Sequence, residues 1–515
     1  MDSFATNTAV FDSWLHRHYD YISDDIAIAD LRDSHEGRGL LARNDIQKDT
    51  VLFRLSRDHI LNIRTAALGK LKPGNQEVLE TLNQWEALIL CLAYEMMLGE
   101  ESQWSSYLAV LPEKFNSLMF WSSEELEKLK PSNVLQRIGR EQAEQMHSKL
   151  VPEYCLRLGS KKLVDYLTID RFHKVASIIM SYSFDVDDPE DDPEDDPEDD
   201  PEDDPEDDPE DSEDQEEEVD ELEQECIKYD GYLKSMVPLA DILNSNTNLV
   251  NANLSYENDA LVMTATKDIK KGEQIYNIYG ELPNSEILRK YGYVELPASK
   301  YDFAELPVSV IKQTFVDNYL SSLDSKIRET LFDKTAELIN DSDYLDESLE
   351  DLEEGIVLDS YEVFADSDVL PELLLLIQIL TTCYESFETD PKWAKKLARS
   401  RSELESFVNR CILKSYQLVE KNIITNRCVE NLNKCVEGRI AQYGTAQNYE
   451  IPASYRDFDR TELASIVLRC EVNCLRNVLN NFSEKYERID DSKLLKNVLK
   501  RKAEADAQKH KKQRT

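Results

Sequence analysis

Near the start of the chain, apolar residues recur at the spacing of one helix face. Phe11, Trp14, Leu15 and His18 lie at positions i, i+3, i+4 and i+7. This spacing predicts a short amphipathic helix within residues 1–24. After this segment the pattern changes to short apolar stretches separated by turn residues, which is typical of β-strands.

Two segments far apart in the chain share one strand–turn–strand pattern. Leu41–Phe53 and Thr264–Tyr276 align without a gap, with Asp45 and Asp268 in step and lysines at both turns. Each segment taken alone predicts a β-hairpin. Two such units more than 200 residues apart suggest one β-fold that is interrupted by an insertion. Chance similarity is the alternative for so short a stretch.

The interval between these segments is mostly helical in pattern. Apolar residues recur at helical spacing in 84–98 and in 170–182, and Ser122 stands at a capped helix start. We therefore predict a helical insert at about residues 80–182. Because the β-pattern resumes after it, the insert and the strands are expected to form one domain over residues 25–280.

Beyond Pro297 the helical pattern returns and continues to about residue 490. It is clearest in 461–482, where one apolar stripe follows the predicted helix, as expected for helices that pack on helices. We predict a helical domain over residues 281–490 and a basic tail over 491–515. The tail holds two basic clusters, which indicate either a bipartite nuclear import signal or a solvated helix end. If the tail is an import signal, the protein is expected in the nucleus, with the cytoplasm as a second compartment.

The charge of the chain is concentrated in one tract. The formal net charge is −44, and 28 acidic residues but no lysine or arginine lie between Asp187 and Glu225. Six Asp-Asp-Pro-Glu units begin this tract, and their prolines and like charges predict a disordered acidic loop over 187–225. The loop either attracts a basic partner or is a tolerated repeat without a role. A polyanion is repelled by phosphate, so we expect no direct contact with nucleic acid.

The cysteines, the histidines and the longest apolar run exclude further classes of protein. The nine cysteines form no Cys-x-x-Cys pair and the seven histidines form no metal-binding pattern, so we expect reduced intracellular thiols and no metal site. The chain opens without a secretory signal pattern. Its longest uncharged apolar run, Leu373–Tyr384, is shorter than the roughly 20 residues that cross a bilayer. We therefore expect a soluble protein with no membrane partner, of undetermined oligomeric state.

Three segments carry candidate chemistry. Glu36–Leu40 contains a Gly-x-Gly pair, which allows the backbone to approach a ligand, but it lacks the third glycine of a dinucleotide site. Val237–Asn246 places polar side chains at the end of an apolar stretch. The third segment is Ile275–Gly280 with the following stretch Ile287–Glu295. Each part contains a Tyr-Gly pair, and the two pairs are twelve residues apart.

Together and in this order, these segments resemble the SET domain of protein lysine methyltransferases. The class is the one typified by the Rubisco large-subunit methyltransferase. Pro238–Glu295 is most similar to the ribosomal lysine methyltransferases of fungi, and Ser102–Tyr107 resembles the insert of this class. By motif the resemblance covers about residues 11–295. It implies an α+β fold, in which a SET-domain β-fold with a helical insert is followed by an all-α C-terminal substrate-binding domain.

The resemblance also implies a cofactor, S-adenosyl-L-methionine, and roles for individual residues. Tyr279 is the implied catalytic residue, because its hydroxyl can orient a lysine amine and its ring can face a sulfonium. The implied cofactor-binding residues are Arg38, Gly39 and Leu40, through their backbone, with Tyr182, Asn244, Ser245, Tyr279 and Tyr291. The implied substrate-binding residues are Trp104 and Ser183. In-line methyl transfer needs positioning and electrostatics and no covalent intermediate, which fits the lack of a nucleophile triad.

The sequence departs from the class in two places. Many relatives have Asn-His where this chain has Asn244-Ser245. The change is harmless if the second residue contacts the cofactor through its backbone, and weakens binding if the contact is through the ring. The cysteine-rich zinc segment that follows many histone-directed SET domains is missing, which fits the class with a helical C-terminal domain.

The function implied by the resemblance is that of a protein-lysine N-methyltransferase. The expected substrate is a basic protein of the 60S ribosomal subunit. The alternative is an acidic chaperone for basic ribosomal proteins or histones, built on a catalytically inactive SET fold. Such a binder has no need of the cofactor, so cofactor binding separates the two alternatives.

Overall fold

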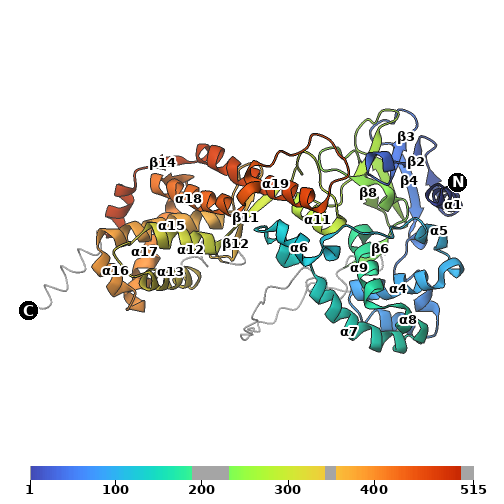
Figure 1. Ribbon diagram of the computed structural model, residues 1–515, viewed down its shortest axis with the longest axis horizontal. Helices are drawn as coiled ribbons and strands as arrows, with labels where there is room; N and C mark the ends of the chain where they lie inside the picture. Colours follow the sequence, from blue (N-terminus) through green and yellow to red (C-terminus); the bar gives the residue numbers. More distant parts are fainter. Residues whose placement is uncertain (1, 188–230, 343–354, 500–515) are drawn as a thin grey trace, which may run out of the picture. The chain divides into compact units, whose positions relative to one another are not determined.

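The structure is a computed structural model that describes residues 2–187, 231–342 and 355–499 (Figure 1). The predicted disordered acidic loop lies outside the described residues from residue 188 onward. Residues 500–515 of the predicted basic tail lie outside them as well.

The chain divides into two units, each discontinuous in sequence. The first comprises Met1–Lys128, Val134–Ser299 and Pro452–Leu463, and the second comprises Leu129–Asn133, Lys300–Ile451 and Ala464–Thr515. The main division lies near residue 300, and the sequence pattern placed it at 280. The difference arises because α11 (Asn284–Tyr291) packs on α9 (Ile169–Tyr182) within the first unit.

Among the residues that the structure describes, the first unit contains two four-stranded sheets and one strand pair. One sheet has the order β1 (Tyr21–Ile22), β4 (Val51–Ser56), β9 (Ala260–Ala265), β8 (Ala252–Tyr256). The other has the order β2 (Ile26–Asp30), β3 (Arg38–Ala42), β10 (Gln274–Asn277), β7 (Asn244–Ser245). The strand pair is formed by β5 (Ser183–Asp187) and β6 (Tyr232–Met236).

The two similar strand–turn–strand segments are not hairpins, so that prediction was wrong. The two strands of each segment lie in different sheets: β3 pairs with β10 and β4 pairs with β9, all antiparallel. The segments therefore pair with each other across more than 200 residues. This arrangement joins the two sheets and confirms that one β-fold spans the helical insert.

Hydrogen bonds also link the turn of each segment to the other segment. Asp268 Oδ1 accepts a hydrogen bond from the Lys48 N–H at 2.9 Å, and Asp45 Oδ1 accepts one from the Lys271 N–H at 2.9 Å. Each aspartate thus binds the turn of the other segment. The aligned residues of the two segments are therefore equivalent in space as well as in sequence.

The helices of the first unit follow the predicted pattern. The insert contains α4 (Gln84–Leu98), and Ser122 and Glu125 form a reciprocal capping box at the start of α6. The N-terminal helix α1 (Ser3–His18) buries Phe11, Trp14 and Leu15. The remaining helices are α2 (Ala67–Lys70), α3 (Asn75–Leu79), α5 (Ser105–Leu108), α6 (Ser123–Leu126), α7 (Arg140–Arg157) and α8 (Lys161–Tyr166).

The second unit is helical, as predicted, with two strand pairs that the sequence pattern did not indicate. The pairs are β11 (Phe303–Pro307) with β12 (Ser360–Phe364), and β13 (Ile423–Thr425) with β14 (Glu487–Ile489). The helices are α12 (Val308–Asn318), α13 (Ser325–Asn340), α15 (Pro371–Thr389), α16 (Pro391–Leu397), α17 (Arg401–Val419), α18 (Asn426–Gln442) and α19 (Arg460–Asn481), of which α19 begins in the first unit.

The eight cysteines within the described ranges are buried, and none of them forms a disulfide. In the same part of the chain, no helix combines the length and apolar character needed to cross a membrane.

Candidate active site

Five of the predicted site residues line one cavity of about 370 Å³ in the first unit, which we call the Asn244 cavity. They are Tyr182, Asn244, Ser245, Tyr279 and Tyr291. They reach it from the end of α9, from β7, from the segment after β10 and from the end of α11. Cavities of roughly 300–1,000 Å³ are typical of small-molecule sites. The fold therefore gathers four distant segments around a space suited to a small molecule.

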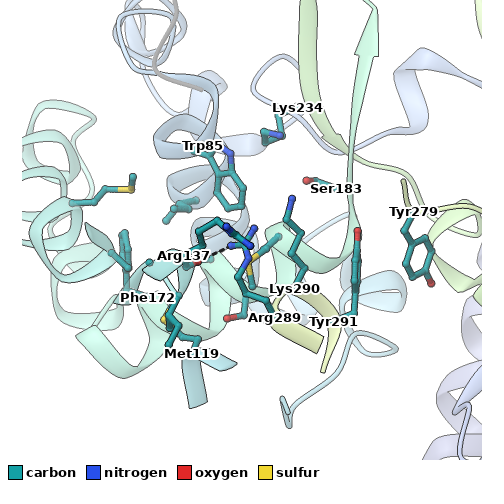
Figure 2. Close-up of a pocket in the computed structure, with 18 of the residues that line it drawn as sticks. Trp85, Met119, Arg137, Phe172, Ser183, Lys234, Tyr279, Arg289, Lys290 and Tyr291 are labelled. Carbon is teal, nitrogen blue, oxygen red and sulfur yellow. Dashed lines mark hydrogen bonds between the residues drawn. The ribbon is translucent and has the colours of Figure 1, made fainter. Parts of the chain in front are cut away.

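A second cavity of the first unit, of about 210 Å³, shares two of these tyrosines. Tyr279 and Tyr291 line it together with Trp85 and Ser183, and we call it the Trp85 cavity. Figure 2 shows the two tyrosine rings at one end of this cavity. Because both tyrosines line both cavities, the two spaces lie next to each other at these residues. Two reactants held in separate cavities would therefore come together there.

Tyr279 is fixed by contacts at both ends of the residue. Its N–H donates to Ser245 Oγ at 3.2 Å, its hydroxyl donates to the Leu243 carbonyl at 2.8 Å, and its ring centroid lies 4.7 Å from that of Tyr291. Burial, together with the neighbouring Tyr293 and other acidic groups, raises the pKa of Tyr279 well above its usual value. The phenol is therefore protonated at physiological pH, so it can donate a hydrogen bond but cannot serve as a base.

Asn244 is held in a polar chain that ends in a carboxylate. Its Nδ2 donates to the Arg38 carbonyl at 3.1 Å and to Gln274 Oε1 at 2.7 Å. Gln274 Nε2 in turn donates to Glu36 Oε2 at 2.8 Å, and the Tyr276 hydroxyl donates to Glu36 Oε1 at 3.2 Å. Parallel pairing of β7 with β10 places these groups side by side. Asn244 and Glu36 both line the cavity, so this network fixes two of its polar groups.

The side chains of Arg38 and Leu40 lie outside the Asn244 cavity. The Arg38 guanidinium packs on the Phe4 ring at 3.8 Å and its Nε donates to Thr8 Oγ1 at 2.9 Å, whereas Leu40 is buried in the core. The sequence assigned these residues a role through their backbone. The Arg38 carbonyl does contact Asn244, and the contact with a cofactor stays a prediction.

Gly39 sits where a side chain would disturb the same network. A Cβ at this position would lie 2.5 Å from Gln274 Oε1 and 2.9 Å from Asn244 Nδ2. These distances are shorter than van der Waals contact, so any larger residue would displace both amides. The absence of a side chain at Gly39 therefore leaves room for the hydrogen-bonded pair of Asn244 and Gln274.

The two predicted substrate-binding residues differ in their placement. Ser183, the first residue of β5, lines the Trp85 cavity. Trp104 is only 2 % exposed, packs 5.8 Å from the Trp14 ring, and lines neither cavity. The structure therefore places Trp104 in the core of the first unit, where the sequence had assigned it to a groove.

Several residues of the Asn244 cavity were not predicted. His35, Glu36 and Tyr293 line it, as does a segment around Tyr455 and Phe458. Glu36 and Tyr293 lie beside the predicted Gly-x-Gly and Tyr-Gly motifs, so proximity could have indicated them. Nothing in the local pattern near Tyr455 indicates a role, because this segment is more than 150 residues beyond the last motif.

A buried carboxyl lies close to the tyrosines of the site. Asp241 is 5 % exposed, and its Oδ2 accepts a hydrogen bond from the Tyr107 hydroxyl at 2.5 Å. Burial raises the pKa of Asp241 to about 7, although the Tyr107 hydrogen bond lowers it. Burial, and secondly the Asp241 charge, raise the pKa of Tyr182 to about 12. The ionised form of Asp241 is thus disfavoured in the folded protein.

This raised pKa predicts a pH-dependent effect of Asp241→Asn on stability. In the unfolded chain the carboxyl loses its proton near pH 4, whereas the folded protein retains it to about pH 7. The unfolded chain therefore binds fewer protons between these values, and the Asp241 contribution to stability falls as pH rises, by at most about 1.4 kcal/mol per pH unit. Asparagine does not titrate, so the variant gains stability relative to wild type between pH 5 and pH 8. Urea denaturation at both pH values measures this difference, and an equal difference at both would contradict the assignment.

The chain is similar to known methyltransferases along its whole length. The SET domain family matches residues 37–280. The chain is 36 % identical over 519 aligned residues to ribosomal lysine N-methyltransferase 4 of Saccharomyces cerevisiae, covering 98 % of this chain and 97 % of that protein. It is 28 % identical to N-lysine methyltransferase SETD6 of Homo sapiens, over 54 % of this chain and 52 % of that protein.

Among solved structures, the fold is similar to that of Rubisco LSMT bound to sinefungin and monomethyllysine. The TM-score is 0.57 at 18 % sequence identity, and the match covers 95 % of both chains. This similarity confirms the predicted α+β fold, with a SET domain, a helical insert and a helical C-terminal region.

Proposed function

Because the chain belongs to the SET-domain protein lysine N-methyltransferases, we propose that its substrate is a lysine of a basic protein of the large ribosomal subunit. The enzyme class and the methyl donor, S-adenosyl-L-methionine, follow from the family. The proposed target is supported by the name of the Saccharomyces cerevisiae relative, which matches this chain over nearly its full length.

The observation that carries the reaction is that two cavities lie next to each other at Tyr279 and Tyr291. A methyl transfer between two bound molecules needs each to be held separately, with the reacting atoms aligned. The Asn244 and Trp85 cavities provide two such places. The shared tyrosines mark the point where the reacting atoms would meet.

The Asn244 cavity fits the expected methyl donor in its chemistry. Asn244 supplies an amide and Glu36 a carboxylate, suited to the charged and hydroxyl groups of the molecule. The rings of Tyr279 and Tyr291 are suited to a sulfonium, because cations are attracted to aromatic faces. When bound, S-adenosyl-L-methionine supplies an activated methyl group on its sulfonium. Asn244, Glu36 and the tyrosines are the residues that would hold it.

The chain's own contribution to the transfer is to position and desolvate the lysine amine. The partly buried rings of Tyr279 and Tyr291 limit the access of water, and a less solvated environment disfavours the charged ammonium over the neutral amine. The Tyr279 hydroxyl donates its proton to the Leu243 carbonyl, so its oxygen can accept an N–H of the amine and leave the amine lone pair free for the transfer. Since Tyr279 does not ionise near neutral pH, it adds no pH dependence of its own to the transfer.

The Trp85 cavity is suited to the protein side of the reaction. Its wall includes apolar and aromatic side chains such as Trp85, Met119 and Phe172 (Figure 2). Two of its cationic side chains are paired: Arg137 bonds Glu286 at 3.0 Å and Lys234 bonds Asp185 at 2.8 Å. Arg289 and Lys290 line the cavity as well, so its apolar wall, and not its charged groups, is where the stem of a lysine and its flanking residues can lie.

Methyl transfer from radiolabelled S-adenosyl-L-methionine to separated ribosomal subunits and to histones tests the proposed target. We expect one labelled band among the large-subunit proteins, and none among small-subunit proteins or histones. Label on histones alone would contradict the ribosomal target while leaving the enzyme class intact. No label on any fraction, together with binding of basic proteins, would favour the chaperone alternative.

A further inference from the structure

A short segment of the first unit lies between two stretches of the second unit in the sequence. This segment, Pro452–Leu463, which we call the strap, follows Ile451 and precedes Ala464, both of which belong to the second unit. Five of its residues line the Asn244 cavity: Tyr455, Arg456, Asp457, Phe458 and Leu463. The strap therefore supplies a wall of the cavity that no SET-domain motif in the sequence provides.

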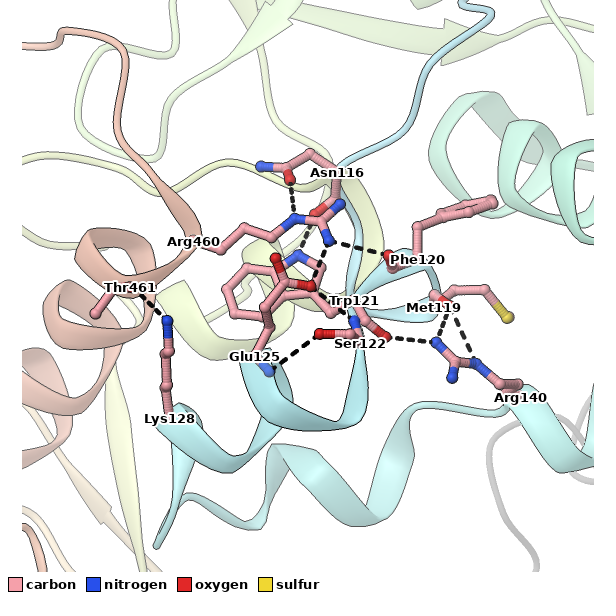
Figure 3. Close-up of polar contacts among 10 residues, drawn as sticks. All are labelled: Asn116, Met119, Phe120, Trp121, Ser122, Glu125, Lys128, Arg140, Arg460 and Thr461. Atoms are coloured by element: carbon pink, nitrogen blue, oxygen red, sulfur yellow. Dashed lines mark hydrogen bonds and ion pairs between the residues drawn. The ribbon is translucent and has the colours of Figure 1, made fainter.

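One part of the strap is attached to the region around Trp121 through Arg460 (Figure 3). Arg460 Nε donates to Asn116 Oδ1 at 3.0 Å, and its Nη1 pairs with Glu125 Oε2 at 2.7 Å. The guanidinium also lies 5.5 Å from the Trp121 ring. Charge-assisted and cation–π contacts of this kind, made to partly buried groups, are stronger than those of an exposed ion pair.

Arg460 is also the first residue of α19, and two hydrogen bonds between its neighbours fix the direction in which the chain enters this helix. Asp459 Oδ1 accepts the Glu462 N–H at 2.9 Å, and Glu462 Oε2 accepts the Asp459 N–H at 3.1 Å. This reciprocal arrangement is a capping box, which sets the entry of the chain into the helix. The contacts of Arg460 and this capping box together fix the position at which the strap leaves the cavity and α19 begins.

The other part of the strap is attached to two further walls of the cavity. The Tyr455 hydroxyl donates to the Val294 carbonyl at 2.7 Å and accepts a hydrogen bond from the Leu296 N–H at 3.2 Å. Asp457 Oδ1 lies 2.8 Å from His35 Nδ1. The strap thus contacts both the segment after Tyr293 and the loop before β3, and it joins these two walls.

We propose that the strap is part of the cofactor-binding site and that Arg460 is the residue that positions it. The inference rests on the cofactor of the proposed function, and it adds residues from far beyond the SET domain motifs. The family motif assigns the amino-acid end of the cofactor to Asn244 and Ser245, and Tyr279 and Tyr291 would face the sulfonium. The strap, with the rings of Tyr455 and Phe458, is then the wall for the adenosine, whose base stacks on aromatic side chains.

Isothermal titration with S-adenosylhomocysteine tests this proposal without a protein substrate. We expect Arg460→Ala to weaken binding at least about tenfold, because the strap loses its attachment, and Arg460→Lys to retain part of the affinity. Arg401→Ala is the matched control: Arg401 pairs with Glu337 at 2.6 Å and with Asp341 at 2.8 Å in the second unit. Its binding should equal that of wild type.

A second variant and a kinetic readout keep the test decisive if Arg460→Ala folds poorly. Tyr455→Phe removes a single hydroxyl and should weaken S-adenosylhomocysteine binding by severalfold. In both strap variants the KM for S-adenosyl-L-methionine should rise while the KM for the protein substrate stays within about twofold of wild type. Wild-type affinity in both strap variants would overturn the proposal. Failure of the wild-type protein to bind would instead overturn the cofactor on which it rests.

Discussion

Replacing Tyr279 by phenylalanine is expected to lower the rate of methyl transfer at least about 100-fold and to change S-adenosylhomocysteine affinity by less than about threefold. The hydroxyl is the only part removed, and it is the group that can hold the lysine amine where the two cavities lie next to each other. Loss of one positioned hydrogen-bonding group at the reacting atoms typically costs a factor of about 100 or more in rate. Single-turnover methylation with saturating cofactor measures the effect on the transfer step.

The matched control for Tyr279→Phe is Tyr361→Phe in the second unit. The Tyr361 hydroxyl is also buried and also donates to a backbone carbonyl, that of Ile356, at 2.8 Å. Either substitution leaves a buried carbonyl without its donor, which costs about 1–3 kcal/mol of stability. Only Tyr279→Phe should slow methylation. Equal loss of activity in the two variants would show that the Tyr279 effect is one of stability.

Gly292→Ala is expected to produce the largest loss of stability among single substitutions near the site. A Cβ at Gly292 would lie 2.6 Å from the carbonyl carbon of Asn116 and 2.7 Å from the backbone nitrogen of Ser117, and neither backbone atom can move aside cheaply. The residue also has φ +80°, which disfavours any side chain by about 1–2 kcal/mol. With overpacking of about 1–3 kcal/mol, the free energy of unfolding should fall by about 2–5 kcal/mol.

Gly272→Ala separates the two causes of this loss. Gly272 has φ +86°, but nothing lies within 4 Å of the Cβ that alanine would add. Its loss should therefore be about 1–2 kcal/mol, from backbone conformation alone. Thermal or urea denaturation of both variants measures the difference. Equal losses in the two variants would contradict the close approach of Gly292 to the backbone at Asn116.

The elements that local patterns predicted correctly are those whose partners lie nearby in the sequence. The helix at 84–98 was predicted at its observed bounds, and the capping box at Ser122 is present. Both depend on spacings of three or four residues. The segment Leu41–Phe53 was predicted as a hairpin because a strand, a turn and a strand are compatible with one. Its true partner lies more than 200 residues away, and no local pattern specifies a distant strand.

In the candidate site, too, local motifs were predicted correctly and contacts between distant segments were not. The motifs led to Asn244, Tyr279 and Tyr291, because these residues lie within segments of recognisable order, and the fold brings them to one cavity. Trp104 was assigned from the insert region by resemblance, yet packing against α1 places it in the core. The strap could not be predicted, because its contacts within the first unit, such as that of Tyr455 with Val294, join residues far apart in the sequence.

The central claim is that the methyl donor and the lysine reach Tyr279 from different cavities. A crystal structure with S-adenosylhomocysteine and a lysine-containing substrate peptide tests it most directly. The predicted result is S-adenosylhomocysteine beside Asn244 and Glu36, and the lysine side chain within the Trp85 cavity, with its amine next to Tyr279. The nucleoside in the Trp85 cavity, or both molecules entering from the same side of the tyrosines, would contradict the claim.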